Sequence, residues 1–475
     1  MSNPIVLAHA WTTPGVPETP LGIGYLASYL RAKLGFTDIA IVSADRGIVE
    51  RVLARAPSMV GFYSYTAQLD HVRELAAAIR RERDVPMLLG GPHVSTAPQR
   101  LPAEFDIGVV GEGEQTIVEL VRLLLDGSLG DPRALAGVNG IAFHDGDGVR
   151  VTAPRPLIAD VDSIPPPARD LYDQELLLQR HDAFMRFERI RAIDVFTVRG
   201  CPYQCTYCQQ GAFGHTIRMH SAEYIADEIE QVYKTYRPDG ISFSDDLFTV
   251  NARRVERLIE LLEQRGLLGK LRFRADVRAN LVNDRLIAQL KRLNVVSTSI
   301  GAETGSERLL SRLKGPGVTV AQTRAAIRAL NDADIPVYIC MMVGAPDESP
   351  EEMAQTEAFL REALGWHRFN SCNVNALTPL PGTPLWEQCV SEGLLDPSTP
   401  SRELGFTPDL FAKRTFHICK HISRESLKAT LDRLIQLRAR KYRQTLLRTN
   451  PFGFLRHALR AAIRRIANCR LRIDD

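Results

Sequence analysis

The stretch RGCPYQCTYCQQGAFG, residues 199–214, holds three cysteines in a C-x3-C-x2-C spacing. Cys201, Cys205 and Cys208 supply three thiolates, whereas a structural zinc ion and an ordinary cubane iron–sulfur cluster each take four protein ligands. A zinc site could recruit His215, but no second cysteine pair lies nearby. A [4Fe–4S] cluster held by three thiolates keeps one iron open, as catalytic metal centres do for substrate. The spacing therefore favours a cluster over zinc.

The composition is that of an ordinary globular protein. The chain has 475 residues, of which 45% are hydrophobic and 24% charged, and this length predicts two or three domains. All eight cysteines lie after residue 200, and the tight triplet indicates a ligand set in a reducing compartment, not a disulfide framework. The first residues show no signal-peptide pattern and the chain no long apolar run, so we expect a cytoplasmic protein.

The first part of the chain alternates short apolar runs with amphipathic segments such as 69–82. Continuous apolar strands separated by helices predict a parallel sheet covered on both faces. The run 140–153 predicts a hairpin that turns at Asp-Gly. We assign residues 1–152 to this domain and the proline-rich stretch 153–190 to a linker. The expected strands are 4–10, 38–44, 59–65, 86–91 and 106–111.

A second alternation of strands and helices begins at residue 191. Helical segments such as 221–236, with Ser221 as N-cap, separate its strands. Six such units predict a partial (β/α)6 TIM-type barrel over residues 191–400, with its active site at the carboxyl ends of the strands. Residues 401–475 predict a helical, basic region. The expected barrel strands are 194–200, 240–246, 271–277, 296–303, 336–344 and 369–377.

The cysteine triplet, with an aromatic residue before its last cysteine and a strand directly before it, resembles the radical S-adenosylmethionine (SAM) superfamily. The resemblance implies that the amino and carboxylate groups of SAM occupy the open iron. It also implies that an electron from the cluster cleaves SAM to a 5′-deoxyadenosyl radical. The protein then positions the cofactors and excludes water from the site.

Four further stretches, each following a predicted strand, resemble SAM-binding motifs of this superfamily: SDDLF (244–248), GAETGSE (301–307), MVGAPDES (342–349) and TPLPGTPL (378–385). In the first, two aspartates replace the usual Gly-Gly-Glu, and carboxylates are strong acceptors for an ammonium group. Cys340 and Cys372, within strands, are expected to be small buried residues. The residues that the resemblance places at SAM are Tyr207, Ser244, Asp245, Asp246, Glu303, Thr304 and Gly344.

The N-terminal domain resembles the cobalamin (B12)-binding domain that precedes many radical SAM enzymes, a Rossmann-like parallel sheet. The resemblance rests on the stretches 20–31, 61–68, 88–98 and 109–120. Its glycines would let backbone approach a large flat ligand. The usual D-x-H-x-x-G motif is absent, since 43–51 reads SADRGIVER; a docking domain without cofactor is therefore the alternative. The cobalamin contacts implied are Ser64, Tyr65, Thr66, Gly90, Gly91, His93, Gly111, Glu112 and Gly113.

Together the two resemblances imply radical chemistry at an unactivated carbon of a small molecule, with electrons from a flavodoxin-type or reductase donor. Cobalamin-dependent methyl transfer is the main hypothesis, and ring formation, as in the magnesium-protoporphyrin monomethyl ester cyclases, is the alternative. A cobalamin or redox sensor is the non-enzymatic alternative. The tRNA methylthiotransferases carry three further cysteines in their first domain, and this chain has none there.

The C-terminal tail is basic, with eleven Lys/Arg and two Asp/Glu from Gln436 onward. Residues 454–473 place Leu455, Leu459 and Ile463 at helical spacing. We expect a helix packed on its own barrel, with contact to an anionic membrane surface as the alternative. The chain carries no nucleic-acid-binding module, and we expect no specific nucleic-acid partner.

Overall fold

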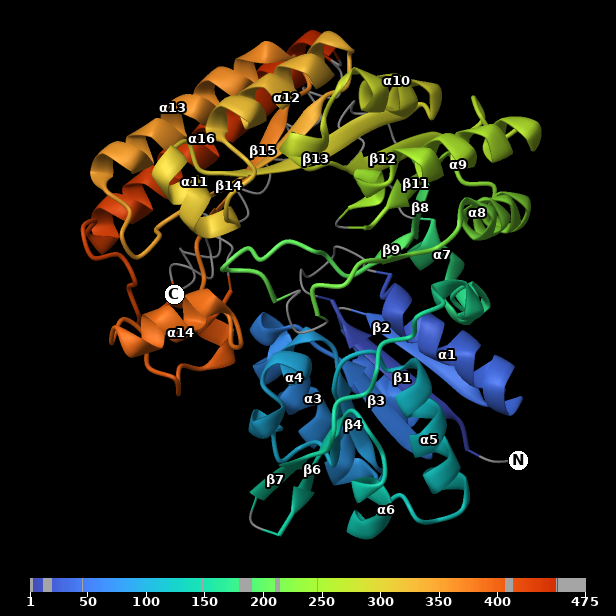
Figure 1. Ribbon diagram of the computed structural model, residues 1–475. Helices are drawn as coiled ribbons and strands as arrows, with labels where there is room; N and C mark the ends of the chain where they lie inside the picture. Colours follow the sequence, from blue (N-terminus) through green and yellow to red (C-terminus); the bar gives the residue numbers. More distant parts are fainter. Residues whose placement is uncertain are drawn as a thin grey trace, which may run out of the picture.

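The protein is built on two sheets, one in each half of the chain (Figure 1). The computed structural model describes residues 3–11, 19–44, 46–146, 148–178, 190–209, 214–245, 247–405, 413–449 and 451. In Figure 1 the first half, blue to cyan, lies below the second half, and the green segment around residue 200 runs between them.

The first sheet has the order β2-β1-β3-β4-β5-β6-β7. Its first five strands pair in parallel, and β6 and β7 form the predicted antiparallel hairpin. The expected strands are confirmed to within a few residues. Their bounds are β1 Ile5–Ala10, β2 Ile39–Ala44, β3 Met59–Tyr63, β4 Met87–Gly90, β5 Ile107–Val109, β6 Ile141–Asp145 and β7 Gly148–Val151.

Helices cover both faces of this sheet, as continuous apolar strands require. Helices α1 (Leu21–Leu34) and α5 (Glu114–Leu125) contribute to one buried cluster, and α2 (Ile48–Leu53) and α3 (Leu69–Glu82) to another. The bounds of α3 match the amphipathic segment read from the sequence. The shorter elements are η1 Thr66–Gln68, α4 Pro92–Thr96, η2 Pro98–Arg100 and α6 Pro132–Ala136.

The second sheet is parallel throughout and has the order β15-β14-β13-β12-β11-β8. Its edges β15 and β8 do not pair, which makes it the expected incomplete barrel. Helices wrap its outside as an arc in Figure 1. The strand bounds are β8 Ala192–Val195, β11 Gly240–Phe243, β12 Arg272–Asp276, β13 Val295–Glu303, β14 Val337–Val343 and β15 Ser371–Ala376.

The expectation of one strand over 194–200 was wrong. The chain leaves the sheet after β8, and β9 (Val198–Arg199) pairs antiparallel with β10 (Arg218–Met219). The cause is Asp245, whose carboxylate accepts hydrogen bonds from the backbone N–H groups of Thr197 and Val198, at 2.6 and 3.0 Å. These donors are thus satisfied away from the sheet ladder.

Side chains of the second sheet alternate between its two faces, as strand geometry dictates. The apolar set, including Ile241, Phe273 and Ile339, is fully buried against the outer helices. The alternate set is largely polar and faces the interior. The helices are α8 Ala222–Tyr236, α9 Ala252–Gln264, α10 Asp284–Arg292, α11 Glu307–Lys314, α12 Val320–Asp332, α13 Pro350–Trp366, α14 Pro384–Ser391 and α16 Arg424–Thr449. The 3-10 turns of this half are η7 Phe248–Val250, η8 Ala279–Leu281 and η9 Ser401–Glu403.

The proline-rich segment between the halves is packed, not extended in solvent. Ile158, Ile164 and Tyr172 are buried in the same cluster as α1. A Cβ on Gly24 would meet the Tyr172 hydroxyl at 2.7 Å and Pro167 at 3.0 Å, so α1 needs glycine there to accept this segment. The segment contains η3 Val161–Ser163, η4 Arg169–Leu171 and α7 Gln174–Leu177.

The C-terminal region contains the long helix α16, which packs against β15. The amphipathic stretch 454–473 lies outside the described residues. Among the helices that are described, none is long and apolar enough to cross a membrane.

Candidate active site

The cysteine loop follows β9 and lies between the two halves of the protein. Cys201, Cys205 and Cys208 are each partly exposed. The loop is tied down by the backbone N–H of Thr206, which donates to the Leu313 carbonyl in α11 at 2.8 Å. Gly200 has φ +82°, and a Cβ there would collide with the Thr216 carbonyl. Within the described residues, no three His, Cys, Asp or Glu side chains converge tightly enough to hold a single metal ion.

Tyr207, before the last cysteine, packs inward and hydrogen-bonds to Glu303. Burial raises the pKa of Tyr207, and the charge of Glu303 raises it further. Glu303 ends β13 with φ +64°, a conformation that non-glycine residues rarely adopt. Its carboxylate lies 3.1 Å from Nζ of Lys314, which also donates to the Gly301 carbonyl at 2.6 Å. Both side chains of this ion pair are less than one-tenth exposed.

The stretch after β11 is only partly described, because Asp246 lies outside the described residues. Ser244 Oγ donates to Asp194 at 2.8 Å. Asp245 is 2% exposed, and its carboxylate is already occupied by Thr197 and Val198. Burial raises the pKa of Asp245 to about 6, against the lowering effect of these hydrogen bonds. Asp245 therefore shapes the start of the cysteine loop.

The glycine motif after β14 is held by a buried carboxylate. Glu348 accepts hydrogen bonds from the backbone N–H groups of Gly344 and Ala345, the second at 3.0 Å. Burial raises the pKa of Glu348 to about 7, and within the described part of the chain its other oxygen has no hydrogen-bond partner. Thr304 is buried and bonded to Thr356 across to α13. These contacts fix the backbone at the carboxyl ends of β13 and β14.

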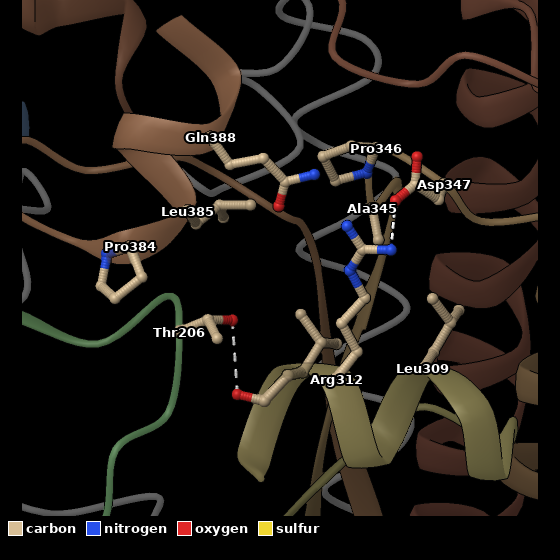
Figure 2. A pocket seen from close by; sticks show the side chains of 10 residues that line it. Thr206, Leu309, Arg312, Ala345, Pro346, Asp347, Pro384, Leu385 and Gln388 are labelled. Carbon is tan, nitrogen blue, oxygen red and sulfur yellow. Dashed lines mark hydrogen bonds and ion pairs between the residues drawn. The ribbon is translucent and has the colours of Figure 1, made fainter. Parts of the chain in front are cut away.

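A small pocket of about 70 Å³ lies behind the cysteine loop (Figure 2). In Figure 2 Arg312 points toward Asp347 across it, and the two form an ion pair. Its volume is well below that of small-molecule sites, which start at about 300 Å³. We assign it no ligand.

The two cysteines within strands, Cys340 and Cys372, differ in exposure. Cys372 is fully buried, as expected, whereas Cys340 is partly exposed on the interior face of the sheet. Burial, with a contribution from the Glu303 charge, raises the pKa of Cys340 to about 12. The thiol is thus protonated at neutral pH.

The loops at the carboxyl edge of the first sheet bring together Thr66 and His93. The two are buried, and Nδ1 of His93 lies 3.2 Å from Oγ1 of Thr66. His93 lies in the short helix α4. Burial lowers its pKa to about 4, and its buried Nε2 atom has no hydrogen-bond partner among the residues that the structure describes. Ser64 is fully buried, whereas the Tyr65 side chain is 42% exposed.

The glycines of these loops serve different purposes. At Gly111, φ is +80° and a Cβ would meet nothing within 4 Å, while its backbone N–H donates to Ser95 Oγ at 3.0 Å. Gly91, with φ +106°, abuts the Ser64 backbone, where a Cβ would lie 2.7 Å from the carbonyl oxygen. Gly113 packs against Leu26 of α1, and Gly90 ends β4.

Glu112 reaches into the second half of the protein. It forms ion pairs with Arg218 at 2.8 Å and Arg199 at 3.3 Å, and it accepts from the backbone N–H of Ile158 at 3.1 Å. Burial by itself would raise the pKa of Glu112, but the hydrogen bond from Arg218 and the charge of Arg199 lower it. Arg199 also pairs with Glu114 at 2.7 Å. This charged cluster anchors the start of the cysteine loop to the first domain.

Gln209, directly after the last cysteine, is a residue that sequence reasoning missed. Its Nε2 atom donates toward Oγ1 of Thr66 at 3.3 Å, Oγ1 of Thr96 at 3.2 Å and the Pro381 carbonyl at 3.2 Å. Gln209 thus joins the cysteine loop, two loops of the first sheet and the turn after β15. No spacing rule predicts such a contact, because it depends on how the halves pack.

The residues present fit the cofactors that the sequence implies. The triplet is a soft thiolate donor set suited to iron–sulfur clusters. At the first sheet, the free space beside Gly111 suits a large ligand. The buried His93 Nε2, which has no hydrogen-bond partner among the described residues, suits a ligand that brings its own polar groups.

Comparison with known proteins gives two family matches along the chain. The radical SAM superfamily model matches residues 195–360, and the B12 binding domain model matches residues 10–121. The chain is 30% identical over 390 residues to the uncharacterized methyltransferase PH0819 of Pyrococcus horikoshii, covering 80% of each protein. It is 27% identical over 381 residues to the anaerobic magnesium-protoporphyrin IX monomethyl ester cyclase of Cereibacter sphaeroides, covering 78% of this chain and 60% of the cyclase.

Among solved structures, the fold is similar to that of the radical SAM methyltransferase TsrM from Kitasatospora setae, determined with cobalamin and a [4Fe–4S] cluster bound. The TM-score is 0.66 at 20% sequence identity, over 82% of this chain and 75% of TsrM. The likeness confirms the expected fold class. By its two domains and its relatives, the chain belongs to the B12-binding radical SAM enzymes, whose cofactors are a [4Fe–4S] cluster, SAM and cobalamin.

Proposed function

We propose that this enzyme transfers a methyl group from SAM, by way of cobalamin, to an unactivated carbon of a small molecule. The observation that carries the proposal is the position of Gln209, which seats the cysteine loop on the two first-domain loops that contain Thr66 and Thr96. A cluster on the cysteine loop and a cobalamin at the edge of the first sheet would then face each other. Relatives named as methyltransferases favour the same reaction.

Each site residue has a role in this proposal. Cys201, Cys205 and Cys208 bind the cluster, which supplies the electron that splits SAM, while cobalamin carries the methyl group. Asp245 positions the cysteine loop. The SAM contacts are Tyr207, Ser244, Asp246, Glu303, Thr304 and Gly344, and those to cobalamin are Ser64, Tyr65, Thr66, Gly90, Gly91, His93 and Gly111.

Glu112 and Gly113 take a different role from the one that the resemblance implied. Glu112 is engaged by Arg199 and Arg218, and Gly113 packs on α1. We propose that both hold the first domain against the barrel.

The second candidate function is oxidative ring formation, favoured by similarity to the cyclase of Cereibacter sphaeroides. The two reactions differ in what becomes of SAM. Methyl transfer leaves S-adenosylhomocysteine, whereas hydrogen abstraction alone leaves 5′-deoxyadenosine.

The test uses protein made anaerobically with cobalamin supplied and reduced in the presence of SAM. We expect one cobalt and four irons per chain, as the cofactor assignment requires. S-adenosylhomocysteine should form in an amount matching the bound cobalamin, even without substrate. Formation of 5′-deoxyadenosine without S-adenosylhomocysteine would contradict methyl transfer and favour the cyclase reaction.

The cysteines offer an internal control. Cys208→Ala should lose the cluster and all SAM cleavage, whereas Cys340→Ala should keep its iron, because Cys340 lies in β14 and outside the triplet. A Cys208→Ala protein that retains its biological effect would instead favour a sensor.

We further propose an electron donor of the flavodoxin or reductase type and a cytoplasmic location, where thiolates remain reduced. Comparing the rate of SAM cleavage with a chemical reductant and with a purified flavodoxin system tests the proposed electron donor. Fractionation of the cells that make the protein tests the proposed location.

A further inference from the structure

Arg278 is a buried arginine at the mouth of the barrel. It follows β12 at the carboxyl end of the strand and is 8% exposed. Its guanidinium carbon lies 3.6 Å from the ring centroid of Tyr203. Tyr203 stands between Cys201 and Cys205, so this cation is stacked on the cysteine loop itself.

Two nitrogens of the Arg278 guanidinium lack hydrogen-bond partners among the described residues. Its Nε and Nη2 atoms are both buried and unpaired, and among the described residues no carboxylate pairs with it. Arginine cannot lose its proton in a protein, and a buried charge without a partner is costly. Stacking on Tyr203 offsets only part of that cost, because a cation–π contact replaces none of the missing N–H hydrogen bonds.

The neighbouring arginines, by contrast, have hydrogen-bond or ion-pair partners. Arg254, equally buried, donates to the carbonyls of Thr197 and Phe248. Arg274, four residues earlier in the chain, pairs with Asp276 at 2.7 Å. Arg278 is therefore not a routine structural cation, and its free donors are available to a ligand.

The interior face beside Arg278 is polar. The strand register places Asp276 next to Ser299, Ser299 next to Tyr338, and Cys340 next to Asn373. A face with these groups suits a polar molecule and not a purely hydrocarbon one.

We propose that Arg278 binds an acidic group of the substrate, a carboxylate or a phosphate, and so holds the substrate beside the cysteine loop. The proposal rests on the proposed function, because it assumes that the substrate enters the barrel. Two parallel N–H donors of a guanidinium match two oxygens of either anion. The carboxylate of SAM is the other anion at this site, but the family chemistry directs it to the open iron, which leaves Arg278 for the substrate.

The test compares small acids with their neutral methyl esters as matched pairs. Binding to the cluster-loaded and cobalamin-loaded enzyme, with SAM present, is measured by the shift in thermal midpoint across a library of polar carboxylates and phosphates. We expect acids, and not their esters, to raise the midpoint. Arg278→Met should weaken binding of those acids at least tenfold, the loss that a charge-assisted hydrogen bond predicts. Arg278→Lys should bind the acids with intermediate affinity, because lysine keeps the charge but lacks the two parallel N–H donors of the guanidinium.

Arg285→Met is the matched control, since Arg285 is exposed on α10 and its loss changes the net charge equally. Iron content must be equal in all variants, which separates loss of binding from loss of the cysteine loop. A wild-type enzyme that gains no more from acids than from esters would overturn the proposal, whether or not methyl transfer occurs. So would an Arg278→Met variant that binds SAM tenfold more weakly in the absence of any acid, because Arg278 would then serve SAM.

Discussion

Gln209 Nε2 lies 3.3 Å from Thr66 Oγ1, although the two residues are 143 positions apart in the chain. One lies directly after the last cysteine of the triplet, and the other opens the turn after β3. The hydrogen bond therefore connects the two candidate cofactor sites.

Replacing Gln209 by alanine should uncouple these sites. Gln209→Ala keeps all three cysteines, so the iron content should stay at the wild-type level. The ratio of S-adenosylhomocysteine to 5′-deoxyadenosine should fall several-fold, because the cysteine loop loses its hydrogen bonds to Thr66 and Thr96. Gln204→Ala is the control, since Gln204 is exposed in the same loop. Equal ratios in both variants would refute the coupling role.

The ion pair between Lys314 and Glu303 should be sensitive to loss of one partner. Lys314→Met leaves a buried carboxylate uncompensated and should cost about 3 kcal/mol, measured as a lower midpoint of urea unfolding of the apoprotein. Adding Glu303→Gln should restore much of the loss. Lys428→Met breaks the exposed pair with Asp432 and should cost less than about 0.5 kcal/mol. A similar loss from both lysine variants would argue against the buried pair.

Glu348 should make stability depend on pH. Burial raises its pKa from the ordinary 4.5 to about 7, so the folded state favours the protonated carboxyl group. Its stabilising contribution is complete below about pH 4.5 and is lost as the pH rises through about 7, by an amount on the order of 3 kcal/mol. The free energy of unfolding of the wild-type apoprotein should therefore fall relative to that of Glu348→Gln between pH 5 and pH 8. Parallel pH profiles for the two proteins would exclude this assignment.

Gly382 should be intolerant of a side chain because of the other domain. Its φ is +78°, and a Cβ would lie 2.9 Å from the Thr96 carbonyl oxygen. Gly269 has nearly the same φ, +80°, but a Cβ there meets nothing within 4 Å. Both alanine variants bear the backbone strain, about 1 kcal/mol, and only Gly382→Ala should also loosen the contact between halves. We expect proteolysis of Gly382→Ala to be faster than that of Gly269→Ala, because the contact between the halves is looser. Equal rates would contradict this prediction.

Sequence patterns predicted the elements well where local rules govern them. Continuous apolar strands and the amphipathic period of 69–82 gave both sheets and α3, because burial on both faces dictates such patterns. The triplet spacing located the cysteine loop. The break after β8 could not be predicted, because it depends on the Asp245 carboxylate, 48 residues from Thr197.

The contacts between the two domains could not be predicted from the sequence either. The resemblance of residues 109–120 to cobalamin-binding domains placed Glu112 at cobalamin, and the structure shows it paired with Arg199 and Arg218. Arg278 carries no motif at all, and only its burial without partners marks it. Contacts between distant segments follow from packing, which a single sequence does not encode in any local period.

The packing of residues 158–177 on α1 has a consequence for synthesis of the protein. While the ribosome is still making the first domain, the face of α1 that includes Gly24 has no cover, because Tyr172 and Pro167 have not yet emerged. A nascent chain halted at residue 152 would present this apolar surface to chaperones and to other nascent chains. The first domain can therefore reach its final form only once the segment leading to the barrel has left the ribosome.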